Sequence, residues 1–308
     1  MNTKFFRLSL IAALAISFIL PAAQIFGALS AKPTNSTVLV NGKSTTFDSY
    51  NINDFNYFKL RDLAYVLNGS AKQFAIDWDA PNNAMTLRPG TRYTTTGDEM
   101  ASKGSATKSA VLSTQKVYLA GDVNQVPLEA YNIDGYNYFK LRDIGIVLDI
   151  GIGWDDAKNT ISIDSTKGYV ESQTVDALDR AIGEAIISNN KGLFSGGDFV
   201  CQAHIILKTV QNGNNTTAYV MALYEEYKKT GDVIGTSGGS HMPVAITFRK
   251  DNAGNYQLVE YWKPENGNRY TPSIQNKFPQ DLWNKVDTGF YIRALSANTL
   301  KQAQNYYT

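Results

Sequence analysis

The chain has 308 residues, which is enough for two or three small domains. Its 29 basic and 28 acidic residues give a formal charge of +1, so it has no strongly basic surface to attract nucleic acid or anionic lipid. The hydrophobic fraction of 43% is ordinary for a protein that buries a core, and it excludes an intrinsically disordered chain.

Residues 1–31 have the pattern of a secretory signal peptide. Lys4 and Arg7 precede the apolar run Leu8–Leu20, Pro21 follows it, and small residues come next. An uncleaved membrane anchor is the alternative, because the uncharged stretch continues to residue 31. We expect cleavage, since the apolar run is short. In either case the rest of the chain lies outside the cytoplasm, and contact with the membrane is limited to an uncleaved N-terminal segment.

The next part of the chain contains the same segment twice. Tyr50–Leu67 aligns without a gap on Tyr131–Leu148, and both include the sequence NYFKLRD. Self-similarity over some fifty residues marks a duplicated structural unit. The flanking segments match as well: 38–47 with 117–126, and 78–87 with 154–163.

Each copy predicts a small α+β unit. In the first copy, Asn-Gly between 38–40 and 45–47 is a strong hairpin signal. An extended stretch follows, and then apolar residues at 60, 63, 64 and 67 mark one face of a short helix. Alternation around the turn residues APNN predicts a second hairpin. We therefore expect two hairpin, helix and hairpin repeats.

The repeats occupy residues 37–93 and 117–169. The intervening 94–116 is rich in Ser, Thr, Gly, Lys and Ala without periodicity, and this composition is typical of a linker.

Both repeats share a motif of Leu-Arg opening a helix and a later Trp-Asp. These pairs are Leu60-Arg61 and Trp78-Asp79, and then Leu141-Arg142 and Trp154-Asp155. The segments resemble the copper amine oxidase N-terminal-like, or stalk, domain of secreted and wall-associated proteins of Gram-positive bacteria. The resemblance implies a stalk or adaptor module. It does not imply amine oxidation, because that chemistry belongs to a separate domain with three His ligands, and this chain has only two His. We expect no cofactor and no bound metal.

The repeated octapeptide provides the candidate ligand-binding residues. On an extended strand, Phe58 and Leu60 face the core, and the alternate residues face the other way. That second row could stack on sugar rings or contact a partner. We favour burial of its rings against the other hairpin or the other repeat, because small modules need every large ring for a core. The row consists of Phe55, Tyr57, Lys59, Tyr136, Tyr138 and Lys140.

Residues 170–308 predict a separate C-terminal domain. A helical stripe begins near Val175, four β-rich runs follow with turn clusters between them, and two further helices are expected near 274–285 and 294–305. This order favours an antiparallel sheet with helices packed on one face. The segment is weakly similar to extracellular regions of bacterial sensors of the β-lactam-receptor type, whose His-Glu-x-x-His motif is absent here.

One motif in this domain suggests catalysis. Residues 235–239, GTSGG, fit Gly-x-Ser-x-Gly, with Ser240 and His241 following. That motif requires a helix after the Ser, and here a strand follows, so we expect a hairpin loop instead. Cys201 and His204 lie on opposite faces of a strand, which indicates a packed Cys and a hydrogen-bonded His rather than a metal pair.

The sequence therefore predicts a secreted, non-catalytic protein of the cell envelope. Two stalk-like modules would present a C-terminal binding domain to a wall glycan or an envelope protein. Two alternatives stay open: an extracytoplasmic hydrolase with a site near Ser237 and His241, and a sensor domain that binds a small ligand on the concave face of its sheet.

Overall fold

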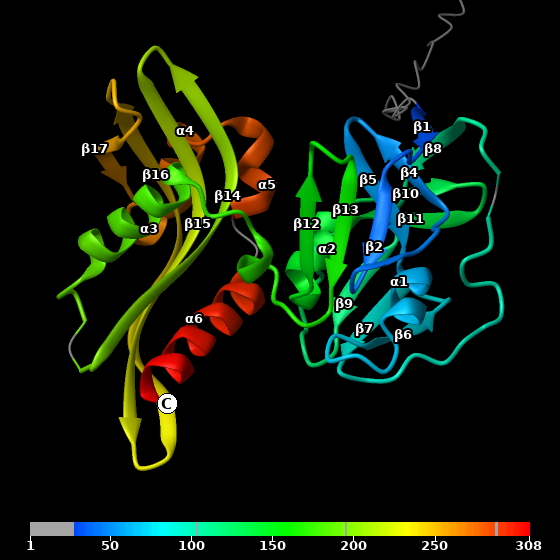
Figure 1. Cartoon of the computed structure of the whole chain (residues 1–308), viewed down its shortest axis with the longest axis horizontal. Coiled ribbons are helices and arrows are strands. Elements are labelled where there is room, and N and C mark those ends of the chain that lie inside the picture. Colours follow the sequence, from blue (N-terminus) through cyan, green and yellow to red (C-terminus); the bar gives the residue numbers. More distant parts are fainter. Residues whose placement is uncertain (1–27, 103, 195, 287–288) are drawn as a thin grey trace, which may run out of the picture.

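The computed structural model describes residues 28–102, 104–194, 196–286 and 289–308 (Figure 1). The protein is of the mixed α+β type, as expected from the sequence, and most of its strand pairs are antiparallel. A barrel half contains both copies of the repeated segment, and a C-terminal half follows it.

The barrel half contains fifteen of the described elements. They are β1 (Leu29–Pro33), β2 (Thr37–Val40), β3 (Lys43–Ser44), β4 (Ser49–Ile52), β5 (Phe55–Lys59), α1 (Leu60–Val66), β6 (Phe74–Asp79), β7 (Ala84–Pro89), β8 (Lys108–Leu112), β9 (Lys116–Leu119), β10 (Ala130–Ile133), β11 (Tyr136–Lys140), α2 (Leu141–Leu148), β12 (Gly151–Asp155) and β13 (Thr160–Asp164).

The C-terminal half begins after the short 3₁₀ turn Val170–Ser172. Its elements are α3 (Ala177–Asn190), β14 (Phe199–Asn212), β15 (Asn215–Thr230), β16 (Val233–Lys250), β17 (Tyr256–Trp262), α4 (Tyr270–Lys277), α5 (Trp283–Val286) and α6 (Ile292–Tyr307), with two further 3₁₀ turns at Gly267–Arg269 and Gln280–Leu282.

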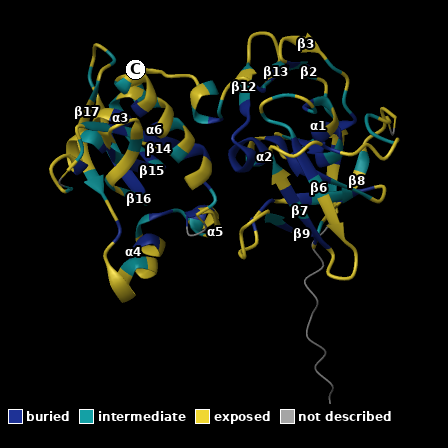
Figure 2. Ribbon diagram, turned by 90° about the horizontal axis from the view of Figure 1, so that it is seen from below, coloured by how far each residue is buried: buried dark blue, intermediate teal, exposed yellow. Residues whose placement is uncertain are grey.

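The two octapeptides pair with each other. Six strands form a closed barrel in the order β1-β4-β5-β11-β10-β8, and Phe58 of β5 lies opposite Phe139 of β11. Each copy contributes equivalent strands, β4 and β5 from the first and β10 and β11 from the second. Figure 2 shows the buried residues gathered in the sheets of each half. Phe58 and Leu60 lie in the main core, as the alternation predicted.

The flanking hairpins exchange partners between the copies. β2 of the first copy pairs in parallel with β13 of the second, and β7 of the first pairs in parallel with β9 of the second. One hydrophobic core contains residues of both copies. The copies therefore fold as one interlocked unit rather than as two modules in series.

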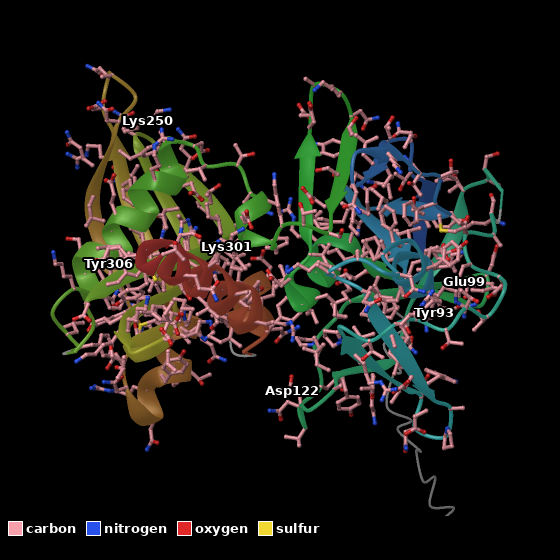
Figure 3. The ribbon with its side chains drawn as sticks, turned by 60° about the horizontal axis from the view of Figure 1, so that its bottom comes forward. Tyr93, Glu99, Asp122, Lys250, Lys301 and Tyr306 are labelled. Atoms are coloured by element: carbon pink, nitrogen blue, oxygen red, sulfur yellow. The ribbon has the colours of Figure 1, made fainter. Side chains whose placement is uncertain are left out.

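The interval 94–116, which the sequence marks as a linker, contains strand β8. This strand pairs with β1 and β10 and completes the barrel. The stretch before it is also held in place, because Asp98 contacts Arg61 at 2.6 Å and the Tyr93 hydroxyl donates to Glu99 at 2.8 Å (Figure 3). The composition of the segment concealed this, because its small residues fit where the chain closes a barrel, as Ala110 does with 1% exposure.

Most of the expected signal peptide lies outside the described residues. Its last positions, Leu29–Ala31, form the first part of β1 and pair with Lys108–Ala110 of β8. Ala31 is fully buried in the barrel. A chain that began at residue 32 would lack most of this strand. Among the described residues, no helix is long and apolar enough to cross a membrane.

The C-terminal half has helices on both faces of its sheet, and the expectation of one covered face is wrong. The strand order is β14-β15-β16-β17. Ile182 and Ile186 of α3 pack on one face, and Ala294 and Leu295 of α6 pack on the other. The physical reason lies in β15, whose apolar run AYVMALY is buried on both sides and needs two covering layers.

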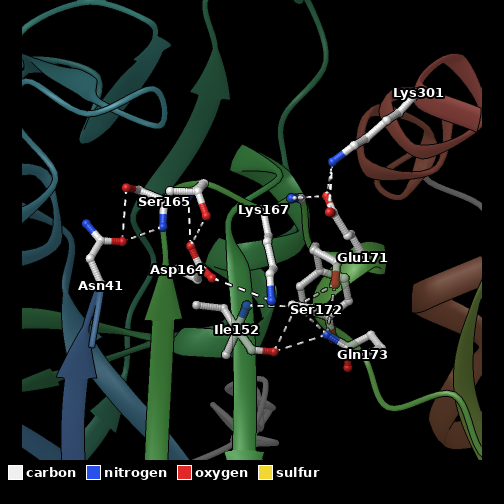
Figure 4. A network of polar contacts seen from close by, with 12 residues as sticks. Asn41, Ile152, Asp164, Ser165, Lys167, Glu171, Ser172, Gln173 and Lys301 are labelled. Atoms are coloured by element: carbon white, nitrogen blue, oxygen red, sulfur yellow. Dashed lines mark hydrogen bonds and ion pairs between the residues drawn. The ribbon is translucent and has the colours of Figure 1, made fainter. Parts of the chain in front are cut away.

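The two halves pack directly against each other. Ile146 of α2 and Tyr169 share a buried cluster with Leu295 of α6. An ion pair between Lys301 and Glu171, 2.7 Å apart, adds a polar contact at the same boundary (Figure 4).

Candidate ligand-binding cleft

Four of the six octapeptide candidates are buried. Tyr57, Lys59, Tyr138 and Lys140 are each at most 8% exposed, whereas Phe55 is 44% exposed. Tyr136 packs at the edge of the barrel cluster. Closing the barrel turns this row inward, so it does not form one exposed binding surface. The burial that the sequence favoured is what the fold shows for the two Tyr rings.

The buried tyrosines connect the copies through equivalent bonds. The Tyr57 hydroxyl donates to Glu129 of the second copy, and the Tyr138 hydroxyl donates to Asp48 of the first. Burial, followed by the acceptor carboxylates, raises the pKa of both phenols above the ordinary value. Both hydroxyls therefore stay protonated and act as donors.

The two equivalent lysines have different surroundings. Lys59 Nζ lies 3.4 Å from Asp48 Oδ2 and 3.2 Å from Asp62 Oδ2, and it donates to the Ala101 carbonyl at 3.1 Å. Lys140 Nζ instead lies 3.3 Å from the centroid of the Phe55 ring, and burial lowers its pKa. Lys59 belongs to a closed structural network, whereas Lys140 and Phe55 border an open space.

That space is a cleft between the barrel half and the C-terminal half, with a volume of about 1640 Å³. The barrel half contributes residues of β5, β11, α2, β12 and the turn after β13. The C-terminal half contributes residues of α3, β14 and α6. A cleft of this size exceeds the usual range for small-molecule pockets and can hold an extended ligand.

His204 is fixed on the C-terminal side of the cleft. Its Nε2 lies 3.1 Å from Asp179 Oδ1 of α3, and its Nδ1 lies 2.9 Å from Gln202 Oε1. Cys201 faces the other side of β14, where its Sγ lies 3.7 Å from the Thr299 carbonyl. The alternation on this strand therefore separates Cys201 from His204, as expected.

Exposed aromatic side chains line the cleft from the barrel half, and cationic side chains line it from both halves. Trp154 is 47% exposed, similar to Phe55, and both contribute ring surface. Arg142 and Arg180 contribute guanidinium groups from opposite halves. Aromatic ring faces and guanidinium groups of this kind bind sugars, peptides and carboxylates.

The GTSGG segment is not a nucleophile elbow. Residues 235–239 lie within β16, and Ser237 is the extra residue of a β-bulge opposite Glu226 and Tyr227. The expected hairpin loop is therefore wrong. The glycines permit close packing instead, because a Cβ on Gly238 would lie 2.8 Å from Phe194.

Ser237 and His241 border a smaller pocket of about 440 Å³. The Ser237 hydroxyl donates to the Glu226 carbonyl at 3.0 Å, so its proton is directed away from a base. Burial lowers the pKa of His241, and its Nε2 has no hydrogen-bond partner within the described structure.

Across the described ranges no group of three or more His, Cys, Asp or Glu side chains could hold a metal ion. Comparison with known proteins gives no match to any family model, any curated protein or any solved structure.

Sequence reasoning missed the cleft and most of its lining. Arg180 and Asp179 belong to no motif in the sequence, and only their position beside β14 gives them a role. The one available signal was Trp154, a large aromatic residue in a repeated Trp-Asp pair.

Proposed function

We propose that this chain is an exported, non-catalytic protein of the cell envelope, in which stalk-type repeats support a binding site for an envelope ligand. The ligand, a wall glycan or an envelope protein, binds in the cleft between the two halves. The repeats contribute one wall of the site as well as supporting it. Export is supported by the N-terminal pattern, and the stalk assignment by the Leu-Arg and Trp-Asp motifs.

One observation carries the proposal. A cleft of about 1640 Å³ is lined from one side by Phe55 and Trp154 and from the other by His204 and Arg180. Large rings that stay exposed cost free energy in water, and burying them against a ligand recovers it. Among the described residues, the His204 ring contacts Asp179 and Gln202 and no hydroxyl or thiol, so it has no nucleophile beside it to activate.

Co-sedimentation of the full chain with purified cell-wall sacculi and with an envelope fraction tests the proposal. Trp154→Ala should weaken binding about fivefold, equivalent to about 1 kcal/mol for a stacked ring. Trp78→Ala is the matched control, because Trp78 is the equivalent residue of the first copy, is 55% exposed, and does not line the cleft. Equal binding by the two variants, or no binding by the wild type, would contradict the proposal.

A second candidate function is a hydrolase at the pocket of Ser237, Ser240 and His241. The unpartnered Nε2 of His241 favours it. Ser237→Ala and His241→Ala would abolish any hydrolysis of wall or ester substrates by the full chain. If both variants behave as the wild type does, this function is excluded.

A further inference from the structure

Two free sheet edges border the cleft. β14 is the outermost strand of its sheet and pairs only with β15, and β12 is the outermost strand of its own sheet and pairs only with β13. Residues 199–206 and 152–154 of these strands line the cleft. Figure 1 shows both strands beside the boundary between the halves. A free edge presents backbone N–H and C=O groups that can template another strand.

The backbone groups of alternate β14 residues point toward the cleft. In an antiparallel strand, the N–H and C=O of one residue point to the same side. The Gln202 carbonyl accepts a bond from Gln302 of α6 at 2.8 Å, so Gln202 points away from β15. By alternation, Val200 and His204 do the same. Their backbone groups have no partner on the cleft side within the described structure.

The β12 edge is filled at its inner end and open beyond it. Ser172 Oγ accepts from the Ile152 N–H at 3.0 Å, and Gln173 Nε2 donates to the Ile152 carbonyl at 3.1 Å (Figure 4). Trp154 is the next residue with the same orientation. The fold therefore blocks further strand pairing at Ile152. On β14 the Gln302 amide occupies only the Gln202 carbonyl, so an added strand displaces that one side-chain bond and pairs with Val200 and His204 on either side of it.

The charges of the cleft select an acidic occupant. Of its four described carboxylates, Glu171 is paired with Lys301, which leaves Asp54, Asp179 and Glu184 against four cations. Its cations form no ion pair with any described carboxylate. These cations are Lys140, Arg142, Arg180 and Lys191.

We propose that the cleft binds an acidic peptide in extended conformation, which adds as a strand to the β14 edge at Val200–His204 and directs carboxylates toward Arg142 and Arg180. A peptide backbone repeats its N–H and C=O with the spacing of the edge, which a glycan does not. The inference rests on the proposed function of the cleft and narrows its ligand to one class.

The test uses a fluorescein-labelled ten-residue peptide that alternates Glu with Thr, and fluorescence anisotropy with the full chain. A Lys and Thr peptide of equal length is the charge control. Two further acidic peptides carry backbone N-methyl groups, on every Glu or on every Thr. We expect the acidic peptide to bind, the basic peptide to bind at least tenfold more weakly, and at least one methylated peptide to lose binding.

Val200→Pro tests the edge from the side of the protein. Proline removes the N–H that points into the cleft and keeps the pairing with β15, a position where edge strands tolerate it. It should weaken binding of the acidic peptide about three- to tenfold. Val200→Ala is the control, because it shortens the side chain and keeps the N–H. Circular dichroism of both variants reports whether they fold.

The outcomes separate this inference from the proposed function. Equal binding by the methylated and unmethylated peptides, or by Val200→Pro and Val200→Ala, would overturn strand addition. Equal binding by the acidic and basic peptides would overturn the charge argument. If no peptide binds while the full chain sediments with the wall and Trp154→Ala weakens that binding, the cleft function stands and the peptide class is wrong.

Discussion

Replacing Lys59 by Met tests whether the two nearly identical copies contribute equally to stability. In the first copy, Lys59 lies within 3.4 Å of the buried carboxylates of Asp48 and Asp62. In the second copy, Lys140 contacts the Phe55 ring and forms no ion pair with a described residue. The sequence alone would predict the same effect for Lys59→Met and Lys140→Met. The structure predicts different effects.

The magnitudes follow from what each lysine leaves behind. Without Lys59, two buried carboxylates lose this ammonium, and breaking a buried pair in this way costs about 3–5 kcal/mol. Without Lys140, the protein loses a cation–π contact of about 1–2 kcal/mol and one of the cations near the Asp143 carboxylate, which keeps Lys285 and Arg142. Relief of a buried charge offsets part of that loss. We expect Lys59→Met to lower the melting temperature by roughly 6–20 °C, and Lys140→Met by only a few degrees.

Thermal and urea unfolding between pH 5 and pH 8 measures both effects. Burial already raises the pKa of Asp62, and removal of its cation raises the pKa further. A carboxyl with a raised pKa takes up a proton on folding, so the deficit of Lys59→Met should shrink as the pH falls. The double variant Lys59→Met/Asp62→Asn should recover part of the loss. Equal losses for the two lysine variants, or a deficit that does not change with pH, would refute the reasoning.

Three further predictions concern strand β1, the Glu99 carboxylate and the glycines of β16. Deleting residues 1–33 removes β1 and opens the barrel, so this variant should lose the cooperative thermal unfolding seen by circular dichroism. Deletion of residues 1–28 keeps β1 and should preserve that transition. Equal unfolding of the two variants would contradict the role of β1 in closing the barrel. Burial acts to raise the pKa of the Glu99 carboxyl, but hydrogen bonds from Thr96, Tyr93 and Gly97 outweigh it and hold that pKa at about 2. Glu99→Gln should therefore destabilise the protein at pH 7, as measured by urea titration. The difference in unfolding free energy between the wild type and Glu99→Gln should fade as the pH falls toward 2, because the stabilising carboxylate is then protonated in the folded state too. A difference that does not change with pH would disprove a stabilising role of the charged carboxylate. Gly238→Ala should cost about 1–3 kcal/mol of unfolding free energy, measured in urea, because the new Cβ overpacks against Phe194. Gly235→Ala is the control and should cost less than half as much, because its Cβ meets nothing within 4 Å. Similar costs for the two variants would count against close packing at the bulge.

Local features of the barrel half could be predicted from sequence because each depends on near neighbours. The short helices, the Phe58 and Leu60 core positions and the downstream hairpins follow from periodicity and turn residues. The exchange of β2 and β7 between copies could not be predicted. The copies share one hydrophobic pattern, so pairing within a copy and pairing between copies satisfy it equally well.

Features of the C-terminal half show where local patterns mislead. The GTSGG stretch has turn composition, yet it forms part of β16, because its glycines let Phe194 and Tyr224 approach the strand. The cleft could not be predicted from the sequence for a different reason. It depends on how two separately packed halves meet, and the residues on either side, such as Trp154 and Arg180, have no relation in sequence.

The exchange of strands between the copies also determines when the barrel half can fold. β2 needs β13, whose last residue is Asp164, and β5 needs β11. When a chain emerges from a ribosome or a membrane channel with its N-terminus first, β2, β5 and β7 therefore lack their second-copy partners until the second copy has followed. Contacts so distant in sequence slow folding and prolong exposure of unpaired strands. The barrel half should thus complete in one late step, after more than half of the protein has appeared.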